Sequence, residues 1–213
     1  MIAGGFAVFF VALWLLWNSP VVLPVKLFVV LLHELSHGLA AVLTGGSIQG
    51  IEVTAAEGGV CYCSGGSAFV TLSAGYLGSF LWGVGLVAAA HRAARWSRWT
   101  VGFVGALIVV ASILFVNGFG FWFGLTFGAA LLVSARFLPA KPNTLILTAL
   151  GLISVLYAIL DIKSDVIDRP GARSDAGMLA ELTGVPTLIW GVLWIGIALW
   201  ISARLLERSV REL

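Results

Sequence analysis

Two histidines and a glutamate lie within five residues of one another inside a long apolar segment. Residues 33–37 read His-Glu-Leu-Ser-His. On a helix, positions i and i+4 share a face, so His33 and His37 can offer two imidazole nitrogens to one metal ion. Glu34 follows the first histidine, where its carboxylate can reach a metal-bound water. Ionisable side chains inside a membrane span are costly, so their presence there indicates a function.

The chemistry that this pattern predicts is hydrolysis at a zinc ion. A catalytic zinc typically has three protein ligands and keeps a fourth position for water. The ion brings the pKa of that water close to neutrality, and Glu34 can accept its proton and pass it to the leaving amine. Chance produces a His-Glu-x-x-His in roughly one chain in a hundred of this length. The apolar surroundings make an accidental match rarer still.

The third ligand is not fixed by this spacing. Glu52 and Glu57 lie in a glycine-rich loop and could fold back toward the histidines. Asp175 is the favoured residue, because it stands where a loop meets a short helical pattern that Ser174 opens and Gly184 closes. An aspartate in that position also has a purely structural use, since it can cap a helix or complement the helix dipole.

The other imidazole and carboxylate side chains are weaker ligands on sequence grounds. The remaining histidine, His91, lies beside Arg92 in a basic segment. A basic segment repels a dication, so we expect an interface residue at His91. Three further aspartates are spaced like solvated loop residues: Asp161, Asp165 and Asp168.

The composition is that of a membrane protein. The chain of 213 residues is 60% hydrophobic and 10% charged, whereas about 25% of the residues in a soluble domain are charged. The net charge of +2 is too small to suggest a nucleic-acid partner. We therefore expect an all-α polytopic protein in a lipid bilayer, with residues 1–213 forming a single integral-membrane domain of about six to seven transmembrane helices.

Seven apolar stretches are candidates for these helices, since a span needs about 20 mostly apolar residues. They cover residues 4–17, 21–43, 69–90, 99–116, 120–137, 144–160 and 185–203. Seven spans are expected, with six as the main alternative. The first stretch lacks a basic region and a clear cleavage site, so we expect a retained span there and not a signal peptide. Residues 117–120 separate the fourth and fifth stretches, which form a tight helical hairpin or one broken element.

The basic residues orient the predicted spans, because cytoplasmic loops carry an excess of lysine and arginine. With seven spans, most of them fall on one side of the membrane: Lys26, Arg92, Arg95, Arg98, Arg136, Lys141, Arg204, Arg208 and Arg211. The opposite side receives Lys163, Arg169 and Arg173. We therefore expect a multi-pass protein of the cell membrane with an outer N-terminus and a cytoplasmic C-terminus.

A glycine-rich segment, residues 44–68, follows the metal motif directly. It contains two β-type runs, residues 48–54 and 60–63, and paired glycines separate them, which is typical of a hairpin. Cys61 and Cys63 point to the same side of such a strand, but a disulfide between them would be strained. We expect incidental small residues there, with a redox or accessory metal role as the alternative.

Two segments of the sequence resemble the site-2 protease family, the intramembrane zinc metalloproteases. The run from His33 to Gly38, followed by Leu39-Ala40-Ala41 and Thr44-Gly45-Gly46, resembles that family's motif helix, which a β-type loop follows as it does here. The family's Ala-Gly-Pro-x-x-Asn pattern has a counterpart in Ala74-Gly75-Tyr76-Leu77-Gly78-Ser79, with Tyr76 for the proline and Ser79 for the asparagine. The family's Leu-Asp-Gly triplet, which carries its third ligand, has no match in this chain.

These departures resemble a compact branch of the family, the peptidase M50B-like proteins of bacteria and plants. There a Ser/Asn-Asp-Ala followed by Leu-x-x-Leu-Thr-Gly-x-Pro takes the later position. The matching residues are Ser174-Asp175-Ala176, Leu179, Leu182-Thr183-Gly184 and Pro186. The resemblance covers about residues 25–200, and it implies that Asp175 is the third metal ligand and that Ser79 replaces the asparagine near the catalytic water.

The function expected from these features is zinc-dependent cleavage of a peptide bond in a membrane-protein or peptide substrate, within or near the bilayer. In this intramembrane endopeptidase His33, His37 and Asp175 bind Zn²⁺, and Glu34 is the general base and acid. The carbonyls of a substrate helix are occupied by its own hydrogen bonds, so the helix must unwind locally before it is cut.

Three residues are expected to bind that substrate. The glycine-rich loop could hold the unwound strand by edge pairing, and this assigns the contacts to Ile51 and Val53 in its first β-type run. Ser79 is the third residue, through its place in the family pattern.

Two other functions fit part of the sequence. A non-proteolytic zinc-containing scaffold or chaperone, that is, a pseudoprotease, would keep the metal but has no need for Glu34. A metal or ion transporter would line a path through several spans with polar groups, whereas here they gather at one site.

Overall fold

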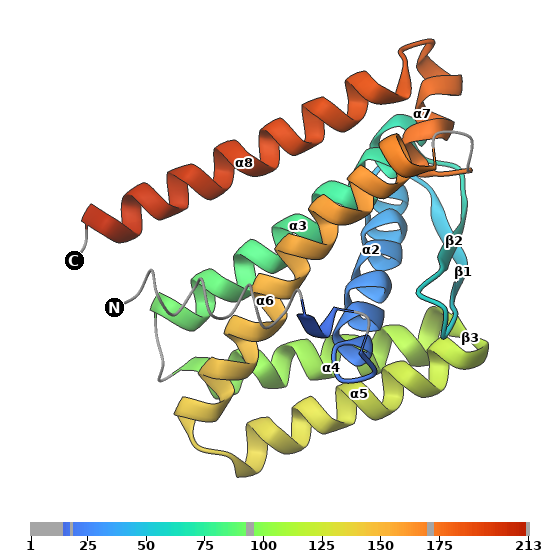
Figure 1. Cartoon of the computed structure of the whole chain (residues 1–213). Helices are drawn as coiled ribbons and strands as arrows, with labels where there is room; N and C mark the ends of the chain where they lie inside the picture. The colour runs from blue at the N-terminus through green and yellow to red at the C-terminus, as the bar shows by residue number, and fades with distance from the viewer. Residues whose placement is uncertain (1–14, 18, 93–95, 170–172, 212–213) are drawn as a thin grey trace.

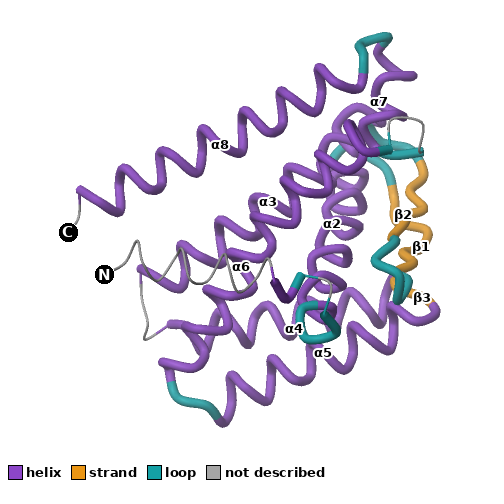
Figure 2. The backbone as a smooth tube through the Cα atoms, in the orientation of Figure 1, coloured by secondary structure: helices purple, strands orange, loops and turns teal. Residues whose placement is uncertain are grey.

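The computed structural model describes residues 15–17, 19–92, 96–169 and 173–211. Helices make up most of this part of the chain, and a small sheet lies along one flank (Figures 1 and 2). The elements follow in the order α2 (Leu23–Leu43), β1 (Ser47–Val53), β2 (Gly59–Ser64), α3 (Ala68–Arg92), α4 (Ser97–Phe115), β3 (Val116–Asn117), α5 (Gly118–Phe137), α6 (Ala140–Lys163), the π-helical segment η2 (Ser164–Asp168), α7 (Asp175–Thr183) and α8 (Thr187–Arg211).

Five of the described helices are long and apolar enough to cross a membrane: α2, α3, α4, α5 and α6 with its η2 extension. Helices α7 and α8 meet at an angle of 119° and make a sixth candidate if they are taken together. The all-α polytopic fold is therefore confirmed, and each predicted span from residue 21 onward corresponds to one of these elements. The predicted first span, residues 4–17, lies almost wholly outside the described residues.

Helix α2, which carries the metal motif, is the most enclosed of these helices. Its apolar window is 72% buried, against 28–39% for the other four. The run from Leu27 to Leu32 is buried on every side of the helix, as expected for a helix that is apolar all round. Pro24 stands in the first turn, where a missing N–H costs nothing. The rest of the protein therefore surrounds the motif.

The β-type segment forms the predicted hairpin. Strands β1 and β2 pair antiparallel, with Ile51 opposite Cys61, and the N–H of Thr54 donates to the carbonyl of Gly58 across the turn. A third strand, β3, was not predicted. It consists of the two residues between α4 and α5, and it pairs in parallel with β1 through Val116.

This third strand changes the role expected for Ile51 and Val53. The sheet order is β2-β1-β3, so β1 is central and Ile51 has a neighbouring strand on either side. Both side chains are buried in the main hydrophobic core. The prediction that these residues hold a substrate strand at an open edge does not fit this geometry, because their alternation points them into the core. Within the described residues, the outer strand of the hairpin is β2, on the side of β1 opposite β3.

The end of α3, the start of α4 and the connection between α5 and α6, which carry basic residues predicted to share one side, lie together at the end of the molecule away from α7 (Figure 1). Arg98, at the start of α4, donates from Nε to the carbonyl of Ala135 and from a terminal nitrogen to that of Arg136, at the end of α5. The C-terminal end of α8 points in the same direction (Figure 1). This grouping agrees with the sequence pattern, and the side that faces the cytoplasm stays a prediction.

Candidate metal centre

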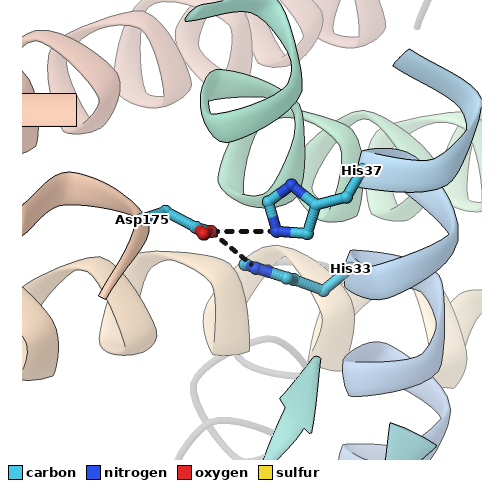
Figure 3. A group of neighbouring side chains, drawn as sticks. All are labelled: His33, His37 and Asp175. Carbon is cyan, nitrogen blue, oxygen red and sulfur yellow. Dashed lines mark hydrogen bonds and ion pairs between the residues drawn. The ribbon is translucent and has the colours of Figure 1, made fainter. Parts of the chain in front are cut away.

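Helix α2 brings His33 and His37 together on one face, one turn apart (Figure 3). Their ring centroids are 4.8 Å apart. The Nε2 atom of His33 lies 2.9 Å from Asp175 Oδ2, and that of His37 lies 3.0 Å from the same oxygen. The three side chains are 14%, 8% and 12% exposed in that order. Two nitrogens and one oxygen therefore converge on one buried point.

The hydroxyl of Ser174 explains why the Asp175 carboxylate is available. Ser174 is the N-cap of α7, and its Oγ accepts the N–H of Gly177. The cap satisfies an N–H group that Asp175 would otherwise compete for. Ala176 and Leu179 are fully buried and fix the short helix against the rest of the protein. The purely structural use of Asp175 as a cap is therefore excluded, since the preceding residue performs it.

The donor set fits a zinc ion. Two imidazoles and one carboxylate are among the usual ligand combinations of catalytic zinc sites. Ligands at 2.0–2.1 Å in a tetrahedron lie about 3.3 Å from one another. The observed separations from Asp175 to the two nitrogens are only a few tenths of an ångström shorter. All three ligand atoms lie within 4.8 Å of one another, so small side-chain movements accommodate the ion.

Glu34 lies beside this group, and its side chain is also buried. Its carboxylate lies against the backbone of strand β2 at Gly59. The approach is close because the strand has no side chain at Gly59, where a Cβ would come within 2.8 Å of Glu34 Cγ. Helix α2 and strand β2 together therefore hold the carboxylate next to the histidines.

A cavity of about 970 Å³ opens onto the four residues, near the upper end of the range of ligand pockets. Strand β2 lines it from Gly59 to Cys63, Asp161 lines it from the end of α6, and Asp165 lines it from η2. The histidines and the carboxylates thus face a space that can admit both water and a segment of peptide.

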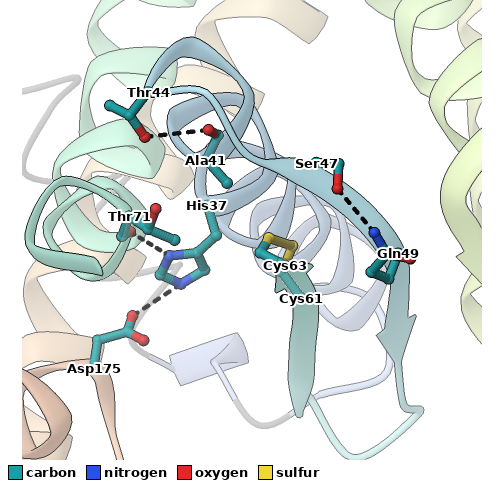
Figure 4. The surroundings of a disulfide bond; sticks show 9 residues. All are labelled: His37, Ala41, Thr44, Ser47, Gln49, Cys61, Cys63, Thr71 and Asp175. Carbon is teal, nitrogen blue, oxygen red and sulfur yellow. Dashed lines mark hydrogen bonds and ion pairs between the residues drawn. A yellow bond between two sulfur atoms is a disulfide. The ribbon is translucent and has the colours of Figure 1, made fainter. Parts of the chain in front are cut away.

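Helix α3 forms the wall behind the histidines. The carbonyl of Thr71 lies 2.6 Å from His37 Nδ1 (Figure 4). A Cβ at Gly75 would come within 2.6 Å of His37 Nε2 and would also meet His33 Nε2, so only glycine lets the helix pass here. Tyr76 packs edge-on against His33, with ring centroids 5.3 Å apart, and its hydroxyl donates to Asp165. The tyrosine that replaces the family's proline is therefore part of the site's wall.

Ser79 does not face the cavity. Its side chain is buried, and its hydroxyl donates to the carbonyls of Gly75 and Tyr76 one turn earlier in α3. The described residues that line the cavity do not include it. The prediction that Ser79 binds substrate does not fit this orientation, because the hydroxyl is engaged within its own helix.

Cys61 and Cys63 form a disulfide beside the site (Figure 4). Their Cα atoms are 5.8 Å apart, within the range of disulfides. The prediction that they share one face of a strand is confirmed, and the prediction that they are unpaired small residues is wrong. A Cβ at Gly38 of α2 would lie 3.7 Å from Cys61 Sγ, so the pair packs against the motif helix.

Among the described residues, the other acidic side chains lie outside the group of three metal-binding residues. Glu57 pairs with Lys26 at 3.1 Å, and Glu52 lies in β1 opposite Val60. The interpretation of Asp161 and Asp165 as solvated loop residues is wrong. Their spacing of four residues at the end of an apolar span was the available signal, since it puts both on one helical face. That face is turned to the cavity.

The predictions that Asp168 is a solvated residue and that His91 is not a metal ligand fit the structure. Asp168 is half-exposed and pairs with Lys163. His91 lies at the far end of α3 from Thr71, exposed, with its Nδ1 2.9 Å from the carbonyl of Val87.

Comparison with known proteins gives one match. Residues 6–204 match the family model described as Peptidase M50B-like, which covers nearly the whole chain. No curated protein and no solved structure matches it.

Proposed function

The chain belongs to the peptidase M50B-like family, within the site-2 proteases, and on that premise we propose that it is a zinc-dependent intramembrane endopeptidase. The observation that carries the proposal is the convergence of His33, His37 and Asp175 on one point, with the buried carboxylate of Glu34 beside them. Its substrates are membrane proteins or peptides, cut within or near the bilayer.

The four residues have distinct roles in this proposal. His33, His37 and Asp175 hold the ion, which when bound supplies a Lewis acid for the scissile carbonyl and an activated water. Glu34 accepts a proton from the attacking water and delivers it to the leaving amine. The close packing of Glu34 against Gly59 of β2 holds the carboxylate in place for both transfers.

The position of α2 supports a reaction inside the protein. The motif helix is enclosed by the other elements, and its His33, Glu34 and His37 face the cavity. Hydrolysis needs water at a depth where the bilayer has none, and an internal polar cavity supplies it.

Strand β2 is the surface that we assign to the substrate strand, in place of Ile51 and Val53. It is the outer strand of the hairpin, and five of its residues line the cavity. Because Gly59 of this strand packs against Glu34, an extended segment laid along β2 passes close to the general base. Main-chain pairing of this kind binds an unwound peptide without requiring a particular sequence.

The test is cleavage of a transmembrane-helix substrate by the purified protein in detergent, compared with Glu34→Gln. The amide is nearly the same size as the carboxylate but cannot accept the proton. We expect Glu34→Gln to lose turnover and to keep its zinc. Cleavage at the native rate by Glu34→Gln would contradict the proposal.

The same variant separates the other two functions. A zinc-containing scaffold or chaperone would be indifferent to Glu34→Gln, whereas a transporter would show an altered ion flux. The burial of Glu34 beside the metal ligands favours the enzyme, because a structural zinc site has no use for a second, uncoordinated carboxylate.

We also propose that the protein resides in the cell membrane with its C-terminus in the cytoplasm. The proximity of Arg98 to the backbone of Arg136 supports a common side for these loops. A fluorescent protein that folds only in the cytoplasm, fused to the C-terminus, should give a signal, and an absence of signal from a stably inserted fusion would reverse the orientation.

A further inference from the structure

Both histidines of the metal centre present the same ring nitrogen to its centre. Nε2 of each ring faces Asp175 Oδ2, so Nδ1 of each ring faces outward. A metal-binding imidazole usually donates its second N–H to a carbonyl or carboxylate, which fixes the tautomer and the ring orientation. The outward partners of His33 and His37 can therefore be sought in the structure.

His37 has a partner of this kind. Its Nδ1 lies 2.6 Å from the carbonyl oxygen of Thr71 in α3. A carbonyl can only accept a hydrogen bond, so Nδ1 carries the proton and the Nε2 lone pair is free to bind an ion. The backbone of α3 thus orients His37 without help from any side chain.

His33 faces a carboxylate in the corresponding place. Its Nδ1 lies 3.9 Å from Oδ2 of Asp161, near the end of α6. Within the described residues, His33 is the one group that pairs with the Asp161 side chain. The two aspartates that follow are occupied elsewhere: Asp165 by the Tyr76 hydroxyl and Arg169, and Asp168 by Lys163.

We propose that Asp161 is a positioning residue that accepts the Nδ1–H of His33 and thereby holds Nε2 toward the metal ion. The separation of 3.9 Å exceeds a hydrogen bond by about 1 Å, so the role requires the carboxylate to move closer to the ring by that distance. The role rests on the proposed function, since it requires that the histidines bind a metal. It makes α6 the third transmembrane helix to shape the site, after α2 and α3.

The experiment measures zinc affinity of the metal-free full-length protein in detergent, by competition with a chromophoric chelator. Loss of an outer partner typically lowers metal affinity 10- to 100-fold. We expect a loss near a hundredfold for Asp161→Ala and near tenfold for Asp161→Asn, whose amide oxygen still accepts a hydrogen bond. Asp168→Asn, seven residues farther along and paired with Lys163, is the control and should bind zinc as the native protein does.

A second readout is the visible absorption spectrum of the cobalt-substituted protein, which reports the ligand geometry. The spectrum should change in both Asp161 variants and stay native in Asp168→Asn. An Asp161→Ala protein that binds zinc within about twofold of the native affinity would overturn the proposal. If that variant does not fold, Asp161→Asn decides in the same way. Failure of the native protein itself to bind zinc would instead overturn the proposed function.

Discussion

Ser174 caps helix α7 with its own hydroxyl, and this frees the carboxylate of the adjacent Asp175 to lie 2.9 Å from His33 Nε2. The two partners of that contact are separated by 142 residues in the sequence. Asp175 therefore links the short helix α7 to the motif helix α2 near the start of the chain, and the Ser174 cap leaves its carboxylate available for this contact.

Replacement of Ser174 tests this connection. Loss of an N-cap costs about 1 kcal/mol, and in Ser174→Ala the Asp175 carboxylate is the nearest group that can replace it. We expect zinc affinity to fall up to about fivefold, the factor that corresponds to 1 kcal/mol. Ser174→Thr retains a capping hydroxyl and should bind zinc as the native protein does. Equal zinc affinities in all three proteins, measured by chelator competition, would show that the Ser174 cap does not affect the metal site.

Gly75 gives a sharper steric test. The Cβ in Gly75→Ala would collide with both metal-binding rings, and misplacement of reacting groups by about 1 Å can lower a rate a hundredfold. We expect at least that loss of cleavage, together with loss of zinc. Gly85→Ala on the same helix is the control, because a Cβ there has no atom within 4 Å among the described residues. A Gly75→Ala protein with native zinc content and turnover would show that α3 does not pack on the histidines.

Removal of the metal should destabilise the protein. An ion that binds only the folded state at a thousand times its dissociation constant stabilises that state by about 4 kcal/mol. Protein from which a chelator has removed the zinc should therefore unfold at a lower temperature. Added zinc should restore both the melting temperature and cleavage. Identical melting curves with and without zinc would mean that no such site forms.

The assignment of β2 as the substrate surface predicts an effect on substrate binding. Tyr62 is half-exposed on this strand and lines the cavity, and a cross-strand pair contributes about 0.2–1 kcal/mol. Tyr62→Ala should raise KM up to about fivefold with kcat unchanged. Gln49→Ala, an exposed position of β1, should leave both constants as they are. A KM effect of Gln49→Ala equal to that of Tyr62→Ala would argue against β2.

Local patterns were sufficient to predict most of the fold. Apolar run lengths predicted the helices from residue 21 onward, and paired glycines predicted the β1–β2 hairpin. The His-Glu-x-x-His spacing predicted that His33 and His37 share a face, because both are on one helix. Its position at the start of a short helical pattern favoured Asp175 as the third ligand but left alternatives open, since the approach of Asp175 to α2 depends on how distant segments pack; the family resemblance strengthened the prediction.

Several of the misjudged residues depend on contacts with segments that are distant in the sequence. Ile51 and Val53 alternate as strand residues should, but the two-residue strand β3, which makes β1 central, leaves no pattern in the sequence. Asp161 was assigned to a solvated loop because it adjoins a charged stretch, although α6 continues past it and turns it toward His33. Ser79 matched a family position, but its neighbours within α3 engage its hydroxyl.

The most direct test is elemental analysis of the purified, detergent-solubilised protein beside two variants. The native chain and Glu34→Gln should each carry one zinc ion per chain, because Glu34 is not a ligand. Asp175→Ala should lose most of its metal, because one of the three ligands is gone. A native protein without stoichiometric metal, or an Asp175→Ala protein with a full complement, would contradict the metal centre on which the account is built.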